Sequence, residues 1–236
     1  MNQHQQRQLD AHTRVQDFFS AKADVIGALG SSEGKQEFDT AVTAVRDLGI
    51  KQGDADREIA GQKSLTEALT INLRTQHMAT IATFARAKLR GVPNYAALTS
   101  TPRLEGAKII RAARTMANAA APYADAMAKG GFPADTVTQL GDAADALERA
   151  IAARANAKVA RVGSTNGINA QLQVAKESVA VMNAAINRQF VGQHAFLASW
   201  NAARRVVSKP GTPRSTAGTT APTPAVATTT PVTSAV

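Results

Sequence analysis

The most informative feature of this sequence is an absence, because none of its 236 residues is cysteine. A chain without cysteine has no disulfide framework, no thiolate nucleophile, no iron–sulfur cluster and no cysteine-based zinc site. Histidine is also scarce, and its four copies include no pair at the H-x-x-x-H or E-x-x-H spacing of helical metal sites. We therefore predict neither a bound metal nor a cofactor.

Long apolar runs are missing as well. No stretch approaches the about 18 consecutive apolar residues that a membrane-spanning helix requires. The N-terminal sequence MNQHQQRQLDAHTRVQDFF lacks the apolar segment of a secretory signal peptide. We expect a soluble, cytoplasmic protein without a transmembrane segment, and export by a route without a cleaved signal stays open as an alternative.

Alanine is the residue present in excess, with 49 copies, about a fifth of the chain. Such a bias favours helices. No segment alternates apolar and polar residues with the period of two that is typical of strands. The sequence therefore predicts an all-α fold, mainly an antiparallel bundle of five or six helices.

Apolar spacing and helix-ending residues divide this bundle into segments. The row Ile168, Leu172, Ala175, Val179, Met182, Ile186 and Phe190 is the clearest single helical face. Gly49, Gly163 and the Gly130–Gly131 pair are expected to end helices, Pro122 to kink or split one, and Ser164 or Thr165 to cap another. The predicted helices lie near residues 4–29, 33–48, 54–90, 101–127, 137–162 and 165–205.

The last 27 residues, 210–236, have a different composition. They contain nine Thr and five Pro, almost no charge and no large apolar residue. Such a segment buries too little apolar surface to offset the entropy of ordering it. We therefore predict a helical domain over residues 1–209 followed by a disordered Thr/Pro/Ala-rich tail over residues 210–236.

The positive charge is concentrated after the first quarter. The chain carries 27 Lys and Arg against 18 Asp and Glu, a net +9, but residues 1–57 carry 7 against 9 and the remainder 20 against 9. A basic cluster beside a helical turn could bind nucleic acid or another anionic surface, whereas the alternative is that these cations only keep Ala-rich helices soluble. The candidate anion-binding face comprises Arg86, Arg90, Arg103, Lys108, Arg111 and Arg114.

Several smaller patterns have a functional and a structural interpretation. The letters Gly30–Gly34 match G-x-S-x-G, but a helix precedes them, so we interpret them as a loop in which Ser31 or Ser32 caps the next helix. Asp142, Asp145 and Glu148 share a helix face and are interpreted as a solvated stripe, because acid–base work would need a cleft that shifts their pKa values.

Two histidines and the single tryptophan complete the candidates. His77 and His194 are interpreted as partly buried side chains, although together they could bind a metal or haem if they faced one cavity. Trp200 is predicted to anchor the end of the last helix, or else, with Arg204 and Arg205, to form a docking site for a partner.

No catalytic constellation emerges from these patterns, so we expect a non-enzymatic structural or protein-interaction bundle of bacterial type, whose partner is this chain or another protein. A basic bundle that binds nucleic acid non-specifically is the alternative. A third hypothesis follows from a resemblance: Ala-rich helices and a biased C-terminal tail are similar to those of phasins, which implies a protein that coats storage granules.

Overall fold

The computed structural model describes residues 1–101 and 105–207, and over these ranges the chain forms helices and turns without any strand. The predicted all-α class is thereby confirmed. The predicted tail, residues 210–236, lies outside the described residues, as does Arg103. Within the described ranges, no helix combines the length and the apolar composition that crossing a membrane requires.

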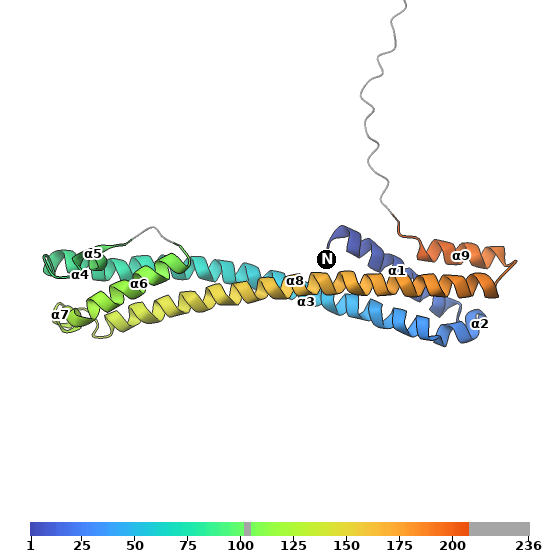
Figure 1. The fold of residues 1–236 in the computed structure, drawn as a ribbon, viewed down its shortest axis with the longest axis horizontal. Helices are drawn as coiled ribbons and strands as arrows, with labels where there is room; N and C mark the ends of the chain where they lie inside the picture. Colours follow the sequence, from blue (N-terminus) through green and yellow to red (C-terminus); the bar gives the residue numbers. More distant parts are fainter. Residues whose placement is uncertain (102–104, 208–236) are drawn as a thin grey trace, which may run out of the picture.

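Two long antiparallel helices run through the whole molecule (Figure 1). The first consists of α3 (Glu33–Asn72), a π-helical turn η2 (Leu73–Met78) and α4 (Ala79–Lys88). The second is α8 (Thr136–Gln189), whose 54 residues span about 81 Å at 1.5 Å per residue. Ser178 Oγ donates to Glu37 Oε2 (2.9 Å) and Gln52 Nε2 donates to Thr165 Oγ1 (2.6 Å), which fixes the antiparallel register.

The predicted helix ends at Gly49 and Gly163 are wrong, because both glycines lie inside continuous helices. An interior glycine costs only about 1 kcal/mol relative to alanine, and packing between the two helices outweighs that cost. Leu48 shows how close this packing is, since a Cβ on Gly167 would lie 3.0 Å from its Cδ1. Ser164 is buried rather than capping a helix, and Thr165 Oγ1 donates to the Arg161 carbonyl within α8 (2.9 Å).

The N-terminal helix is shorter than predicted. α1 (Gln3–Ala21) begins at Asn2 with a capping box to Gln5 and ends at Lys22, followed by α2 (Ala23–Ile26) and the 3₁₀ turn η1 (Gly27–Ser31). Ser32 then caps α3, its Oγ accepting from the Lys35 amide (3.4 Å), which confirms the interpretation of the G-x-S-x-G letters as a capped loop.

The connection between α4 and α8 contains several short elements: α5 (Tyr95–Thr99), α6 (Ala107–Ala120), the 3₁₀ turn η3 (Ala121–Tyr123) and α7 (Ala124–Lys129). Pro122 splits the helix as predicted, and the chain leaves α7 at Gly130 and Gly131, whose φ is +89°. The predicted helix start at Thr101 is wrong, because α6 begins after Gly106, whose φ of +58° suits glycine.

The predicted final helix, 165–205, is also wrong as one element. α8 ends at Gln189, the chain reverses through Gly192 at a φ of +87°, and α9 (His194–Arg204) folds back. Glycine adopts this left-handed conformation without the steric penalty of a Cβ, which explains the reversal at this position.

The helices gather at the two ends of the long pair, where each end has its own hydrophobic core (Figure 1). We call the first the terminal head: it packs α1, α2 and α9 against the adjoining parts of α3 and α8. The second, the hairpin head, packs η2, α4, α5, α6 and α7 against the first turns of α8. Large fully buried side chains include Ile26, Phe38 and Trp200 in the terminal head, and Leu73, Met78, Ile81, Leu98, Ile109, Met116, Met127, Leu140 and Leu147 in the hairpin head.

Between the heads only two helices remain, and we call this part the waist (residues 49–68 and 152–167). Small and polar residues are buried in it, among them Gln52, Ala55, Ala157 and Ser164. Because burial of apolar surface supplies most of the stability of helix pairs, the waist gains little from its own packing. Its polar contacts instead favour one register, as single polar residues do in coiled coils.

Trp200 is the largest fully buried side chain and holds α9 in the terminal head. Its indole Nε1 donates to Asn183 Oδ1 (2.9 Å), and its ring lies 5.4 Å from that of Phe18 and 5.9 Å from that of Phe19. We expect Trp200→Ala to lower the free energy of unfolding by about 3–5 kcal/mol, measured by urea denaturation with circular dichroism. The exposed neighbour Ser199 gives the control, Ser199→Ala, which should stay within about 0.5 kcal/mol; equal stability of the two variants would contradict this role.

His12 is a buried titratable group of the terminal head, with its ring edge-on to Phe38 at 5.6 Å. Burial lowers the pKa of His12 below its ordinary 6.5. Below pH 6.5 the unfolded chain therefore binds a proton that the folded chain refuses, and the free energy of unfolding falls until the pH reaches the lowered pKa.

We expect His12→Leu to flatten the loss of stability below pH 6.5, since each unit of pKa difference is worth about 1.4 kcal/mol. Urea midpoints measured between pH 7.5 and pH 5 test this, with the exposed His4→Gln as control. An unchanged pH profile in His12→Leu would show that other groups cause the acid sensitivity.

Candidate interaction surfaces

The predicted anion-binding face lies on the hairpin head, where Arg86 on α4 and Arg90 in the turn after α4 make hydrogen bonds to backbone carbonyls. Arg86 Nη2 donates to the Thr99 carbonyl (3.0 Å), and Arg90 Nε donates to the Arg86 carbonyl (2.9 Å). The first bond ties α4 to the end of α5, and the second holds the turn after α4 on the last residues of that helix. Both side chains remain exposed, and neutral carbonyl acceptors leave their charge uncompensated.

Arg114 is the member of the predicted face whose charge is compensated. Its Nη2 lies 2.6 Å from Asp145 Oδ1 and 2.6 Å from Glu148 Oε2, both on α8. The hydrogen bonds that Arg114 donates to Asp145 and to Glu148 raise the pKa of Arg114 above its ordinary value. Arg114 therefore links α6 to α8 instead of presenting a free cation, and the predicted acidic stripe is partly a structural clamp.

Lys108 and Arg111 are the cations of the face that border the cavity between α5 and α6. They stand on α6 at the edge of an open cavity of about 520 Å³ between α5 and α6. Neither makes an ion pair with a carboxylate of the described residues. The other lining residues are small or hydroxylic: Ala96, Ala97, Ser100, Ala112 and Thr115.

Trp200 is fully buried in the terminal head, so it anchors the last helix and is not the exposed aromatic of a docking site. Arg204 donates to Asn201 Oδ1 (2.9 and 2.8 Å), and Arg14 donates to the carbonyl of Arg205 (2.6 Å). The physical reason is the aromatic core of this head, which gives the indole both apolar neighbours and an acceptor for its N–H.

The two histidines considered for a shared metal or haem lie in different heads. His77 belongs to η2 in the hairpin head, whereas the exposed His194 begins α9 in the terminal head. Residues 1–101 and 105–207 contain no cluster of three His, Asp or Glu side chains arranged to hold a metal ion.

A surface that the sequence did not predict lies on one side of the waist, where the structure has two neighbouring cavities. The larger, about 590 Å³, is lined by Lys63, Thr66, Glu67, Thr70, Ile71, Arg74, Glu105, Gly106, Ile151 and Arg154. The smaller, about 320 Å³, is lined by Met1, Asn2, Gln5, Gln52, Asp56, Arg161 and Thr165.

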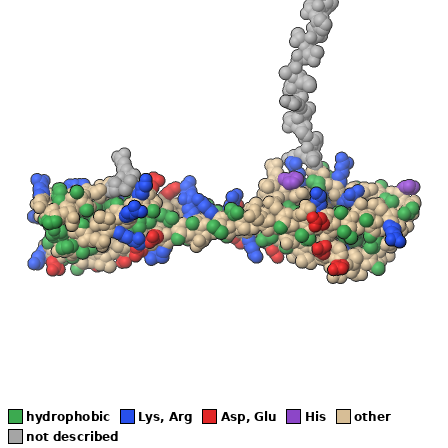
Figure 2. Space-filling model, viewed as in Figure 1, with side chains coloured by type: hydrophobic (Ala, Val, Ile, Leu, Met, Phe, Trp, Pro, Cys, Tyr) green, Lys and Arg blue, Asp and Glu red, His purple; other side chains and the backbone are tan. Residues whose placement is uncertain are grey.

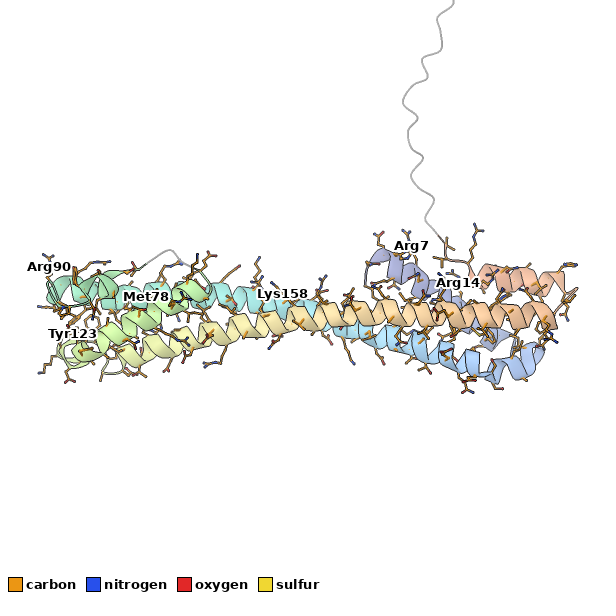
Figure 3. All side chains as sticks on the ribbon, viewed as in Figure 1. Arg7, Arg14, Met78, Arg90, Tyr123 and Lys158 are labelled. Carbon is orange, nitrogen blue, oxygen red and sulfur yellow. The ribbon has the colours of Figure 1, made fainter. Side chains whose placement is uncertain are left out.

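The two cavities lie one after the other along the same faces of α3 and α8. Residues three or four apart share a helix face, and Lys158 stands at i+4 from Arg154, which lines the larger cavity. Thr165, seven residues after Lys158, lines the smaller one. Figure 3 shows Lys158 on the waist between the two heads. We call this side of the waist, with its two cavities and Lys158 between them, the notch.

Two helices begin at the edges of the notch. Asn2 and Gln5 of the α1 capping box line its smaller cavity, and Gly106, the N-cap of α6, lines the larger one. Both helices run outward from the notch into their heads (Figure 1). Because a helix N-terminus carries a partial positive charge, both ends add to the positive potential there.

The charged side chains of the notch are mixed, with cations in the majority. Asp56 pairs with Arg161 (2.5 Å), Glu67 lies 3.9 Å from Lys63, and Glu105 also lines the larger cavity. Arg154 and Lys158 make no ion pair with a described carboxylate, and the buried Nε of Arg154 has no hydrogen-bond partner among the described residues. Figure 2 shows Lys and Arg side chains along this margin of the waist.

Sequence analysis missed the notch because four separate segments build it. The signal that was available is local: in the waist, interface positions that are apolar in both heads become Gln52, Gln62 and Arg154. Such a change marks a part of a helix pair whose packing differs from that of the heads.

Comparisons extend this picture no further: no model of a known protein family, no curated protein and no solved structure matches the chain.

Proposed function

We propose that this protein is a non-enzymatic adaptor, a rod that carries two separate helical heads and joins partner proteins. The observation that carries the proposal is the unbroken course of α3 and α8 through the waist between two independent cores. The 20 waist residues of α3, 49–68, separate the cores by about 30 Å.

The elongated form leaves apolar surface exposed at the waist, and an adaptor function accounts for this. Folding the same helices into one bundle would bury the apolar side chains that the waist leaves exposed, such as Leu65 (46% exposed) and Val159 (72%). A chain that keeps this surface open holds its heads apart, which suits a protein that contacts partners at several places.

The separation of the heads can be measured directly, because a chain without cysteine accepts spin labels at introduced cysteines only. Thr40→Cys and Thr75→Cys place labels on exposed positions on either side of the waist. Their 35-residue spacing along one helix predicts a label distance near 53 Å. A pulsed electron spin resonance distance below about 40 Å would contradict the rod.

Gly61 supplies matched variants for the waist. It lies inside α3, and a Cβ added to it would have no other atom within 4 Å. Gly61→Ala should leave the distance between the labels unchanged. Gly61→Pro should broaden the distribution of that distance, because proline kinks a helix interior.

The adaptor role is tested by affinity capture from native lysate with the full chain as bait, before and after nuclease treatment. We expect the same proteins to be enriched in both samples and to be depleted with the Gly61→Pro bait. Loss of all enrichment after nuclease, or turnover by the pure protein in a hydrolase, transferase or redox assay, would overturn the proposal.

A second candidate, binding of nucleic acid, is favoured by the uncompensated Lys108 and Arg111 beside the α5–α6 cavity. It predicts that fluorescence anisotropy detects binding of labelled DNA at 50 mM salt, and that the affinity falls steeply by 200 mM. The double substitution Lys108→Glu, Arg111→Glu should abolish binding, while Lys22→Glu, Lys176→Glu, which makes the same charge change at exposed positions of the terminal head, should retain most of it. Absence of binding at 50 mM salt would remove this candidate.

A further inference from the structure

We propose that the notch binds an acidic amphipathic helix of a partner protein, lying across the waist between α1 and α6. The inference rests on the adaptor function and names the chemistry of one partner. It is argued from the width of the notch, its charge and its exposed apolar side chains.

The width suits one helix. Gln52 lies at the edge next to α1 and Lys63 at the edge next to α6. These residues stand eleven positions apart on α3 (63 minus 52), about 16 Å at 1.5 Å per residue. An α-helix with its side chains is about 10–12 Å across, so it fits crosswise, whereas the two heads obstruct a long helix running lengthwise.

The charge suits carboxylates. Arg154 and Lys158 are one helical turn apart on α8, and neither is paired with a described carboxylate. The N-terminus of α6 has no side-chain cap, so its first amides remain available as donors. Glutamates on a partner helix would therefore meet two cations and a positive helix end in a site partly sheltered from water.

The apolar side chains at the notch favour an acidic helix over a nucleic acid as its ligand. Ile71 lines the larger cavity and is 59% exposed, and Val162, four residues after Lys158, is 56% exposed. Proteins that bind single strands stack bases on aromatic rings, but neither waist segment, 49–68 or 152–167, contains an aromatic residue. Cations beside aliphatic side chains match the apolar and acidic faces of an amphipathic helix.

The experiment uses two fluorescein-labelled peptides of 18 residues, each with Leu at i, i+3, i+4 and i+7. One carries Glu at the flanking positions and the other Lys. At 50 mM salt we expect addition of the full chain to raise the fluorescence anisotropy of the Glu peptide and not that of the Lys peptide. At 200 mM salt the affinity of the chain for the Glu peptide should be at least threefold lower.

Lys158→Glu should lower the affinity of the chain for the Glu peptide at least fivefold. The matched control is Lys176→Glu, an equal charge change at an exposed position of the same helix in the terminal head. Circular dichroism checks that both variants remain helical.

The proposal is overturned if both peptides bind equally, if the Glu peptide does not bind, or if Lys176→Glu weakens it as much as Lys158→Glu, since that would reflect net charge alone. If single-stranded DNA displaced the Glu peptide, and if Lys158→Glu weakened the binding of that DNA, the notch would be assigned to nucleic acid instead. The adaptor function is judged separately: capture of partners that survives nuclease and Lys158→Glu would support the adaptor while removing the notch as its docking site.

Discussion

The antiparallel packing of α3 against α8 is the contact on which the rest of the structure depends. Within residues 1–101 and 105–207, α1 and α9 in one head, and α5 to α7 in the other, pack on this pair and on each other. All of these helices except α1 are shorter than the about 15 residues below which isolated helices are marginal in water, so each head requires the long pair as a template. The two helices, in turn, are held together mainly where the heads supply apolar side chains, because the waist between them buries small and polar residues.

The two cores therefore provide most of the stability of the helix pair, and the polar contacts of the waist fix its register. The cores around Phe38 and Leu147 bury large apolar side chains, while Gln52, Asp56 and Arg161 contribute polar contacts in the waist. Exposed ion pairs add little free energy, typically less than about 1 kcal/mol. Their effect is selective instead, because a shift of the two helices by one turn would break each of these contacts and leave buried polar groups without partners.

Local signals carried the sequence-based predictions that were confirmed, and tertiary contacts explain those that were wrong. Pro122 splits its helix and Ser32 caps α3 because a missing amide hydrogen and a hydroxyl acceptor act within a few residues. Gly163 does not end its helix, because its neighbours pack on α3, a partner about a hundred residues away in the chain. Trp200 offered two hypotheses, and only the fold shows the indole beside Asn183 rather than at the surface.

The candidate site was harder to foresee than the fold for a related physical reason. A helix reveals itself by the period of its own apolar residues, whereas the notch combines α1, α3, α6 and α8, and no single stretch contains its pattern. The same geometry that leaves the waist bare also creates the notch: two heads too far apart to touch each other, two helix N-termini directed back toward the gap, and polar residues where an apolar interface would otherwise continue. The elongated form and the notch thus share one cause, the length of two helices that neither glycine nor polar substitution interrupts.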